Sequence, residues 1–463
     1  MSAQRFPRVR LCARQTEPAT LLIRGARVLD PRSGVDGAND LLIRGGVVAE
    51  IGTAGSLDAP EGAEVVEGEG QVVLPGFVDP HVHLRTPGRE DEEDLESGSR
   101  AAAAGGFCRI LAMPNTDPVV DAAHVLRALQ ERASSEAVVP VGFLGSITKG
   151  LRGQELTEMV ELAREGAAGF SDDGYPVVDA NTLRQALQYQ RVAGGVLALH
   201  EEDPSLSGNG AMHEGTVSMV LGLDGIPSIS ESTMIDRDAG IAGYEDGAIH
   251  VLHVSAAESV LAVERSRAAG VRITAEVTPH HLVLTDEAVA SLDPRFKMNP
   301  PLRSQADREA LIVGLRSGVI DCIATDHAPH SREEKEAPFE EAPMGVTGLE
   351  TAFAVLYSDL VLPGVLSLDL LVERMTAGGG PYGLRPPTLE RGAPADLCLI
   401  DLDARWTVGE AGYESRSDNS CFAGRELQGR VLMTLAAGSV AYRERGFAIR
   451  LADDPGVAAR ERA

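Results

Sequence analysis

The sequence predicts an α/β protein, a (β/α)8 TIM-like barrel with a small β-sandwich domain built from both chain ends. Three observations predict this fold. Strand-like and helix-like patterns alternate through the middle of the chain for about 300 residues, a length that suits an eightfold barrel. Short strands with glycine turns occupy both ends instead. Imidazoles and carboxylates follow several of the central strands, where barrel enzymes carry their active sites.

The predicted domain boundaries follow these changes of pattern. Residues 1–19 are expected to be a disordered N-terminal extension, which carries arginines but no apolar signal core. Residues 20–75 and 388–446 are expected to form one composite β-sandwich domain beside a catalytic barrel of residues 76–387. Residues 447–463 are expected to be a C-terminal tail.

Hairpin patterns mark the two ends of the chain. Residues 40–44 and 47–51 are apolar runs that flank Gly45, and glycine between such runs is typical of a tight turn. Residues 395–402 predict a strand near the other end, and a late hairpin is centred on Gly438. We expect these strands to pair with one another across the two ends.

The central segment alternates apolar strands with helices. Residues 182–192 and 257–269 have the periodicity of helices. Strand, loop and helix repeated in this order predict a parallel sheet that closes into a barrel. The runs that predict its buried strands are residues 166–170, 196–200, 250–254, 272–277 and 319–325.

Composition is that of a globular protein and limits its partners. The 463 residues are 43% hydrophobic and 24% charged. The net charge of −27 disfavours nucleic acid and anionic membranes, because both need a basic face. No apolar run reaches the roughly 18 residues of a membrane-spanning helix. Five scattered cysteines without a C-x-x-C pair favour a reducing compartment, so a cytoplasmic location is predicted.

Metal-binding side chains follow four of the predicted strands. His81 and His83 form an H-x-H pair, whose imidazoles lie on one face of an extended strand. His200 and His253 each end another strand, and Asp326 follows a fourth. Because the carboxyl ends of barrel strands meet at one face, we expect these groups to lie together.

The donor set predicts the ion and its chemistry. Imidazoles with a carboxylate suit Zn²⁺ or a similar divalent cation. Zinc lowers the pKa of a bound water toward about 7, which makes hydroxide available at neutral pH. Hydrolysis or cyclisation at a C–N bond is the chemistry expected of such a centre.

The remaining histidines lack this placement. His281 follows a strand but is interpreted as structural, and His250 alternates with the metal-binding candidate on its own strand. No placement argument favours a metal-binding role for His124, His213 or His280.

Five motifs carry a resemblance to a known family. Together they resemble the amidohydrolase superfamily and, within it, the class I dihydroorotases, over roughly residues 20–445. The motifs are FVDPHVHLR at 77–85, MPNT at 113–116, AEVTPHHL at 275–282, FKMNPPLR at 296–303 and ATDHAPH at 324–330.

The resemblance implies one or two Zn²⁺ per chain. His81 and His83 would bind the first ion with Asp326, and His200 and His253 would bind the second. Many amidohydrolases bridge the ions with a carboxylated lysine, but no lysine lies between residues 149 and 297. Class I dihydroorotases use an aspartate instead. The spacing points to Asp173, with the neighbouring Asp172 as the alternative.

A substrate-binding set is also implied by the resemblance. Arg85 offers a planar fork for a carboxylate, and dihydroorotate and N-carbamoyl-L-aspartate both carry one. Asn115 and His330 would complete the carboxylate pocket, and Asn299 would bind the ring amide. Backbone contacts would come from Met344 and Gly345.

The implied reaction is the reversible cyclisation of N-carbamoyl-L-aspartate to (S)-dihydroorotate and water, in de novo pyrimidine (UMP) biosynthesis. Metal-bound hydroxide would attack the ring carbonyl, and Asp326 would act as general acid and base. Another cyclic amidohydrolase, such as a dihydropyrimidinase or allantoinase, is one alternative. The other is a non-enzymatic scaffold that binds aspartate transcarbamoylase.

Quaternary partners follow from the same resemblance. A homodimer is expected, and an active enzyme could also dock with aspartate transcarbamoylase. No nucleic acid or membrane partner is predicted.

Two charged segments flank the predicted site. Residues 331–336 are interpreted as a solvated loop or, alternatively, as a mobile cover of the active site. Residues 89–96 form an acidic run that suits a helix N-terminus. Thr86 departs from the family pattern there, since relatives usually carry an acid before Pro-Gly.

Overall fold

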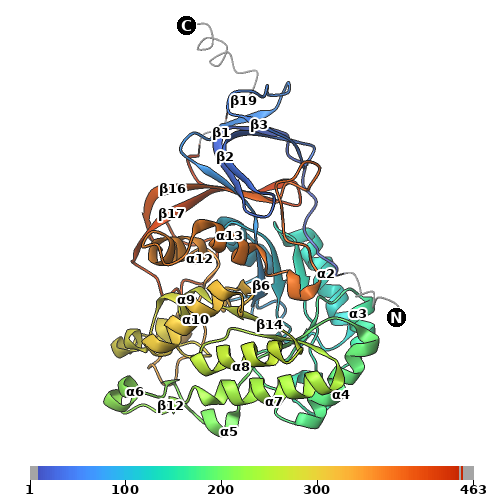
Figure 1. The fold of residues 1–463 in the computed structure, drawn as a ribbon. Coiled ribbons are helices and arrows are strands. Elements are labelled where there is room, and N and C mark those ends of the chain that lie inside the picture. Colours follow the sequence, from blue (N-terminus) through green and yellow to red (C-terminus); the bar gives the residue numbers. More distant parts are fainter. Residues whose placement is uncertain (1–8, 448–449, 452–463) are drawn as a thin grey trace.

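This computed structural model describes residues 9–447 and 450–451 of the chain. A parallel barrel forms the lower part of the molecule in Figure 1, and a sheet made from both chain ends lies above it. None of the described helices is long and apolar enough to cross a membrane.

The barrel consists of a three-stranded and a five-stranded parallel sheet. A single parallel bridge between Gly145 and Phe170 joins them on one side, and a bridge between Val82 and His327 joins them on the other. The predicted α/β barrel is therefore confirmed. Its strands are β6 (Phe77–Val82), β7 (Phe107–Ala112), β8 (Val141–Phe143), β9 (Phe170–Ser171), β10 (Leu197–Leu199), β13 (Ala248–Val251), β14 (Arg272–Val277) and β15 (Cys322–Ile323).

Helices cover the outside of this barrel (Figure 1). Buried residues recur every three or four positions along α4, for example Leu183, Ala186 and Leu187, which gives the helix one apolar face. The predicted helices 182–192 and 257–269 correspond to α4 and α8. The longer helices are α1 (Leu95–Ala104), α2 (Ala123–Glu136), α4 (Ala180–Ala193), α7 (Ile229–Glu245), α8 (Ala257–Ala268), α10 (Gln305–Ser317) and α13 (Leu368–Thr376).

Shorter elements lie in the loops that connect these units. The helices among them are α3 (Met159–Arg164), α5 (Pro204–Ser207), α6 (Thr216–Leu221), α9 (Pro279–Val283), α11 (Arg332–Lys335) and α12 (Ala352–Leu356). The two-stranded pair β11 (Met212–His213) and β12 (Gly225–Ile226) belongs to the excursion after β10.

Strands from both chain ends form one nine-stranded mixed sheet. β16 pairs antiparallel with β5, which joins the two ends, and β1 pairs with β2, β4 and β5. A separate apolar core, which includes Leu21, Leu41 and Leu397, packs within it. The strands are β1 (Leu21–Asp30), β2 (Val35–Arg44), β3 (Val47–Thr53), β4 (Glu64–Glu67), β5 (Val72–Pro75), β16 (Leu397–Thr407), β17 (Glu426–Ala436), β18 (Ser439–Arg443) and β19 (Arg450–Leu451).

Buried aspartates connect this sheet to its surroundings. Asp30 on β1 accepts a hydrogen bond from the Leu389 backbone N–H at 2.9 Å. Asp396 forms an ion pair with Arg109 of barrel strand β7 and accepts the Ala437 N–H at 2.6 Å. The two chain ends are thus tied to each other and to the barrel by charge-assisted hydrogen bonds.

The N-terminal segment differs from the predicted disordered extension. Residues 1–8 lie outside the described residues, but Cys12 is only 4% exposed. Its N–H donates to the Val141 carbonyl at 2.9 Å, and the Val141 N–H donates back at 2.8 Å. The physical reason is that β9 is too short to pair with the start of β8, so this edge is open to the N-terminal segment.

The C-terminal tail also differs from its prediction where the structure describes it. Residues 450–451 form β19, which pairs antiparallel with β4. Residues 448–449 and 452–463 lie outside the described residues.

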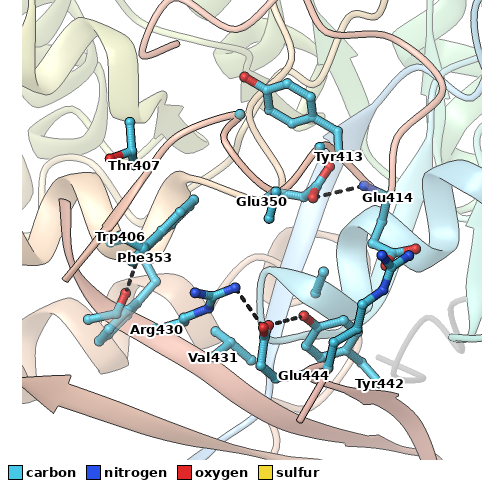
Figure 2. A pocket seen from close by; sticks show the side chains of 17 residues that line it. Glu350, Phe353, Trp406, Thr407, Tyr413, Glu414, Arg430, Val431, Tyr442 and Glu444 are labelled. Carbon is cyan, nitrogen blue, oxygen red and sulfur yellow. Dashed lines mark hydrogen bonds and ion pairs between the residues drawn. The ribbon is translucent and has the colours of Figure 1, made fainter. Parts of the chain in front are cut away.

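A small cavity of about 110 Å³ lies where α12 meets β16, β17 and β18. Figure 2 shows Arg430 and Tyr442 turned toward Glu444. Arg430 and the Tyr442 hydroxyl both donate to Glu444, at 2.6 and 2.7 Å. Glu350 accepts the backbone N–H groups of Glu414 and Ser415 at 3.0 and 3.1 Å. These pairs make the cavity a part of the packing between sheet and barrel.

Replacing Cys12 tests the N-terminal contact. Cys12→Asp places an unpaired charge in a buried position, so we expect the free energy of unfolding to fall by more than about 2 kcal/mol. Cys12→Ala serves as the matched control and should lose less than about 1.5 kcal/mol. Denaturant unfolding of both variants is the measurement, and equal stability of the two would contradict an ordered Cys12.

Glu350 predicts a pH dependence of stability. Burial raises the pKa of Glu350 to about 7, although two backbone hydrogen bonds oppose this shift. The folded state therefore holds a proton that the unfolded state releases near its ordinary pKa of about 4.3. The contribution of protonated Glu350 to the free energy of unfolding is complete below a pH of about 4.3. It is lost as the pH rises through 7. The stability of Glu350→Gln relative to the wild type should increase between pH 5 and pH 8, as measured by urea unfolding.

Candidate metal centre

Polar side chains from several barrel strands converge at one end of the barrel. They line a cavity of about 230 Å³, which is the centre that the sequence predicts. His81 lies buried beneath it. The lining residues are His83, Arg85, Asn115, Asp173, Gly174, His200, His253, Asn299, Asp326, Ala328, His330, Met344 and Gly345.

The first group of donors contains the H-x-H pair of β6. The Nε2 atoms of His81 and His83 lie 3.4 and 3.1 Å from Asp326 Oδ1. The same two nitrogens lie 3.5 and 3.3 Å from Asp173 Oδ2. Two imidazoles therefore face two carboxylates across a space of metal-ligand size.

The second group of donors contains the two histidines that follow β10 and β13. His200 Nδ1 lies 3.0 Å from His253 Nε2. Both nitrogens face Asp173 Oδ1, at 3.6 and 3.5 Å. Asp173 thus presents one carboxylate oxygen to each histidine pair, as a bridging ligand must.

Unpaired buried atoms fit a bound cation at this place. His81 Nε2 and Asp173 Oδ1 are fully buried and have no hydrogen-bond partner. Such groups are costly to bury unless something satisfies them. Four imidazoles and two carboxylates form the nitrogen and oxygen donor set that divalent zinc prefers.

Electrostatics within the cluster favour ionised carboxylates. Burial opposes ionisation of Asp173, but the charge of His81 and the nearby rings of His200 and His253 lower its pKa well below the ordinary range. Burial likewise opposes the charged form of His200, yet Asp173 and Glu202 raise its pKa to about 10. A cation that binds here must displace protons from these imidazoles.

Asp172 and Asp173 point to different places. Asp172 Oδ1 accepts the backbone N–H groups of Ile147 and Thr148 at 2.7 and 3.0 Å, and its other oxygen accepts the Thr148 hydroxyl. Asp172 therefore holds the loop after β8, whereas Asp173 faces the histidines. The geometry favours the first of the two predicted alternatives, Asp173.

Each of three histidines has a second hydrogen-bond partner behind it. His81 Nδ1 lies 2.6 Å from Glu276 Oε1, and His83 Nδ1 lies 2.9 Å from Asn115 Oδ1. His200 Nε2 lies 3.1 Å from Glu202 Oε2. Such outer partners set the tautomer and the ring orientation of metal-binding histidines.

Sequence analysis missed Glu276 and Glu202. Glu276 is the only acid in the otherwise apolar end of β14, and a lone charge there is a signal that could have been used. It also accepts from His250 Nε2 at 3.0 Å, which places His250 in the core. His281 is structural as expected, since its ring nitrogens bond to Thr278 and the Pro300 carbonyl.

Backbone strain is concentrated at the site. Arg85, His253 and Asp326 have φ values of 53°, 33° and 48°, in the left-handed region that residues with a Cβ rarely adopt. Asp79 supports this geometry, because it accepts N–H groups of His81 and Thr325 at 3.1 and 3.2 Å. Strained residues of this kind persist where the surrounding structure holds them, often at functional sites.

The predicted carboxylate pocket lies at one side of the cavity. Arg85 donates through Nε to the Pro329 carbonyl at 3.0 Å, and one terminal nitrogen lies 3.3 Å from His330 Nε2. Glu92, which the sequence analysis did not select, also contacts the guanidinium at 2.9 Å. His330 Nε2 in turn lies 2.9 Å from the Met344 carbonyl.

Gly345 is required by space as well as by conformation. Its φ is 140°, and a Cβ there would lie 2.9 Å from Ala328 Cβ and from His330 Nε2. Only glycine lets the backbone approach the predicted carboxylate pocket this closely.

Both charged segments are more ordered than a solvated surface. Residues 332–335 form α11, and Lys335 donates to the carbonyls of Pro294, Lys297 and Pro343 at 2.8–3.2 Å. The solvated-loop interpretation is therefore wrong for Lys335. In the acidic run, Asp94 is the N-cap of α1, which agrees with the prediction of a helix start.

Paired substitutions separate the two aspartates. Asp173→Asn removes the carboxylate shared by both histidine pairs, so we expect the amount of divalent metal bound per chain to fall. Asp172→Asn, the matched control, should keep its metal and lose only stability. Metal content after dialysis, measured with the unfolding midpoint, checks both variants, and unchanged metal content in Asp173→Asn would contradict a metal-binding role for Asp173.

Known proteins resemble this chain in sequence and in fold. Residues 70–259 match the family model described as dihydro-orotase-like. The chain is 46% identical over 427 residues to a dihydroorotase of Anaeromyxobacter dehalogenans (strain 2CP-C), which covers 92% of this chain and 98% of that protein. It is 45% identical over 423 residues to a dihydroorotase of Geobacter sp. (strain M21), with 91% and 99% covered.

Solved structures share the barrel fold. The L-hydantoinase (dihydropyrimidinase) from Arthrobacter aurescens has a TM-score of 0.82 and 25% identity, and covers 94% of this chain and 98% of that one. A dihydropyrimidinase from Brevibacillus agri NCHU1002 has a TM-score of 0.79 and 24% identity, with 92% and 95% covered. The level of sequence identity over nearly the whole length shows that this chain belongs to the dihydroorotase family.

Proposed function

We propose that this chain is a dihydroorotase that interconverts N-carbamoyl-L-aspartate and (S)-dihydroorotate. The observation that carries the proposal is Asp173, which faces one histidine pair with each oxygen beside a cavity that also holds Arg85. Relatives named dihydroorotase at 44–46% identity support it. The reaction would be a step of de novo pyrimidine biosynthesis.

Two Zn²⁺ ions per chain are proposed as the cofactor. His81, His83 and Asp326 would hold one ion, His200 and His253 the other, and Asp173 would bridge them. Bound zinc would supply Lewis-acid polarisation of the ring carbonyl and a lowered pKa for the attacking water. The ligand atoms of His81, His83 and Asp326 lie within 4.8 Å of one another, as do those of His81, Asp173 and His253.

Asp326 is proposed as the general acid and base. Its Oδ1 lies 3.1 Å from His83 Nε2, and its pKa is held below the ordinary value by His81 and His83 although burial opposes this. In the hydrolytic direction, the Asp326 carboxylate would accept a proton from the attacking water. It would then deliver that proton to the departing ring nitrogen, and cyclisation would run in reverse.

Substrate orientation follows from the polar groups around the cavity. Arg85, with Asn115 and His330, would bind the substrate carboxylate by charge-assisted hydrogen bonds. Asn299 would bind the ring amide, and the backbone of Met344 and Gly345 would close the pocket. A neutral hydantoin or dihydropyrimidine lacks the carboxylate, so Arg85 favours dihydroorotate.

We propose that residues 20–75 and 388–446 act as a β-sandwich domain beside a barrel domain of residues 76–387. We further propose a homodimer, which could dock with aspartate transcarbamoylase, and a cytoplasmic location.

A turnover assay tests the proposed function. The purified, zinc-loaded protein should hydrolyse dihydroorotate, and Asp326→Ala should lower kcat by about 10²- to 10⁴-fold, because proton transfer is lost. The exposed carboxylate of Asp236, which pairs with Arg265 on the surface, provides a control in Asp236→Ala. Circular dichroism would verify that both variants fold.

Substrate comparison separates the alternatives. Faster turnover of hydantoin or dihydropyrimidine than of dihydroorotate would favour a different cyclic amidohydrolase. Zinc binding without turnover of any cyclic amide, even with aspartate transcarbamoylase added, would favour a scaffold. Unchanged turnover in Asp326→Ala would contradict its assigned role.

A further inference from the structure

Glu202 lies directly behind two residues of the cavity wall. It follows β10 by three positions, and its side chain is 19% exposed. Its Oε2 atom lies 3.1 Å from His200 Nε2 and 2.6 Å from Asn299 Nδ2. His200 and Asn299 line the cavity, whereas Glu202 does not. One carboxylate oxygen therefore joins a metal-ligand candidate to a substrate-binding candidate.

This contact determines which atom each neighbour offers to the cavity. A carboxylate accepts hydrogen bonds and donates none, so both facing nitrogens must carry protons. His200 therefore keeps its proton at Nε2, and Nδ1, which faces Asp173 and His253, is the nitrogen that would give up its proton to bind a cation. Asn299 uses its NH₂ group on Glu202, which leaves its carbonyl oxygen as the amide atom that Glu202 does not engage.

The other asparagine of the site is oriented in the opposite sense. Asn115 Oδ1 accepts from His83 Nδ1 at 2.9 Å, and its NH₂ group lies 3.4 Å from the Asp173 carbonyl. Asn115 therefore offers a donor to the cavity, and Asn299 offers an acceptor. The donor suits a substrate carboxylate, and the acceptor suits a ring N–H.

We propose that Glu202 is a positioning residue that fixes the His200 tautomer and the Asn299 amide together. It thereby couples occupation of the second metal position to recognition of a substrate that carries an N–H donor. This inference rests on the proposed function for its substrate. The predicted effect of Glu202 on metal binding rests only on the contacts of His200.

Zinc affinity is the first test of Glu202. In protein stripped of metal, Glu202→Gln should weaken binding of the more weakly held zinc ion by about 10- to 100-fold, because the amide holds the His200 tautomer less firmly. Asn299→Ala should leave zinc affinity unchanged. Glu214→Gln removes the same charge from an exposed position of the same excursion and is the matched control.

Kinetics provide the second test. Glu202→Gln and Asn299→Ala should each raise KM for dihydroorotate, and the double variant should raise it no more than the stronger single variant, because both changes break one linkage. The proposal would be overturned if the increases in KM of the two single variants multiplied in the double variant. It would also be overturned if Glu202→Gln kept the zinc affinity of the wild type. If Glu202→Gln fails to fold, Glu202→Asp replaces it, since the shorter carboxylate withdraws from both partners and should weaken zinc binding likewise.

The two proposals fail in different ways. Absence of dihydroorotate turnover in the wild-type protein would overturn the proposed function, while zinc titration would still decide the role of Glu202. Normal turnover with zinc affinity unaffected by Glu202→Gln would overturn only the positioning role.

Discussion

The Asp173 carboxylate is the interaction on which the site depends. A buried carboxylate is stable only when compensating groups surround it. Here one oxygen faces His81 and His83, and the other faces His200 and His253. These histidines lie in or just after three different strands, so the cluster exists only when the barrel has closed. The same barrel closure depends on single bridges, including the one between Val82 and His327.

The histidines are held from behind as well as from the cavity. Glu276, Asn115 and Glu202 occupy the outer nitrogens of His81, His83 and His200. Ring rotation would break these hydrogen bonds, so they hold the rings in one orientation. Preorganisation of this kind lowers the cost of binding both a cation and a substrate.

The sheet made from both chain ends also reaches the site. Asn419, in the segment between β16 and β17, donates to the Ala328 and Gly345 carbonyls at 3.2 and 3.1 Å. Its carbonyl oxygen accepts the His330 N–H at 3.2 Å. The C-terminal segment therefore supports the loops that carry the predicted carboxylate pocket. These hydrogen bonds join the segment between β16 and β17 to the barrel at the site.

Sequence by itself determined the barrel and its metal-binding candidates, because strand periodicity and position at strand ends are local properties. His81, His83, His200, His253 and Asp326 could all be selected in this way. The choice between Asp172 and Asp173 needed the fold, since both follow the same strand and only tertiary contacts show which one faces the histidines.

Tertiary structure alone decided the supporting residues. Glu202 and Glu276 are ordinary acids in the sequence, and their roles come from partners far away in the chain, Asn299 and His81. The order of residues 10–14 likewise depends on an open strand edge that no local pattern reveals. Local periodicity is encoded residue by residue, whereas the partner of a buried polar group is set by which distant segments the closed barrel brings together.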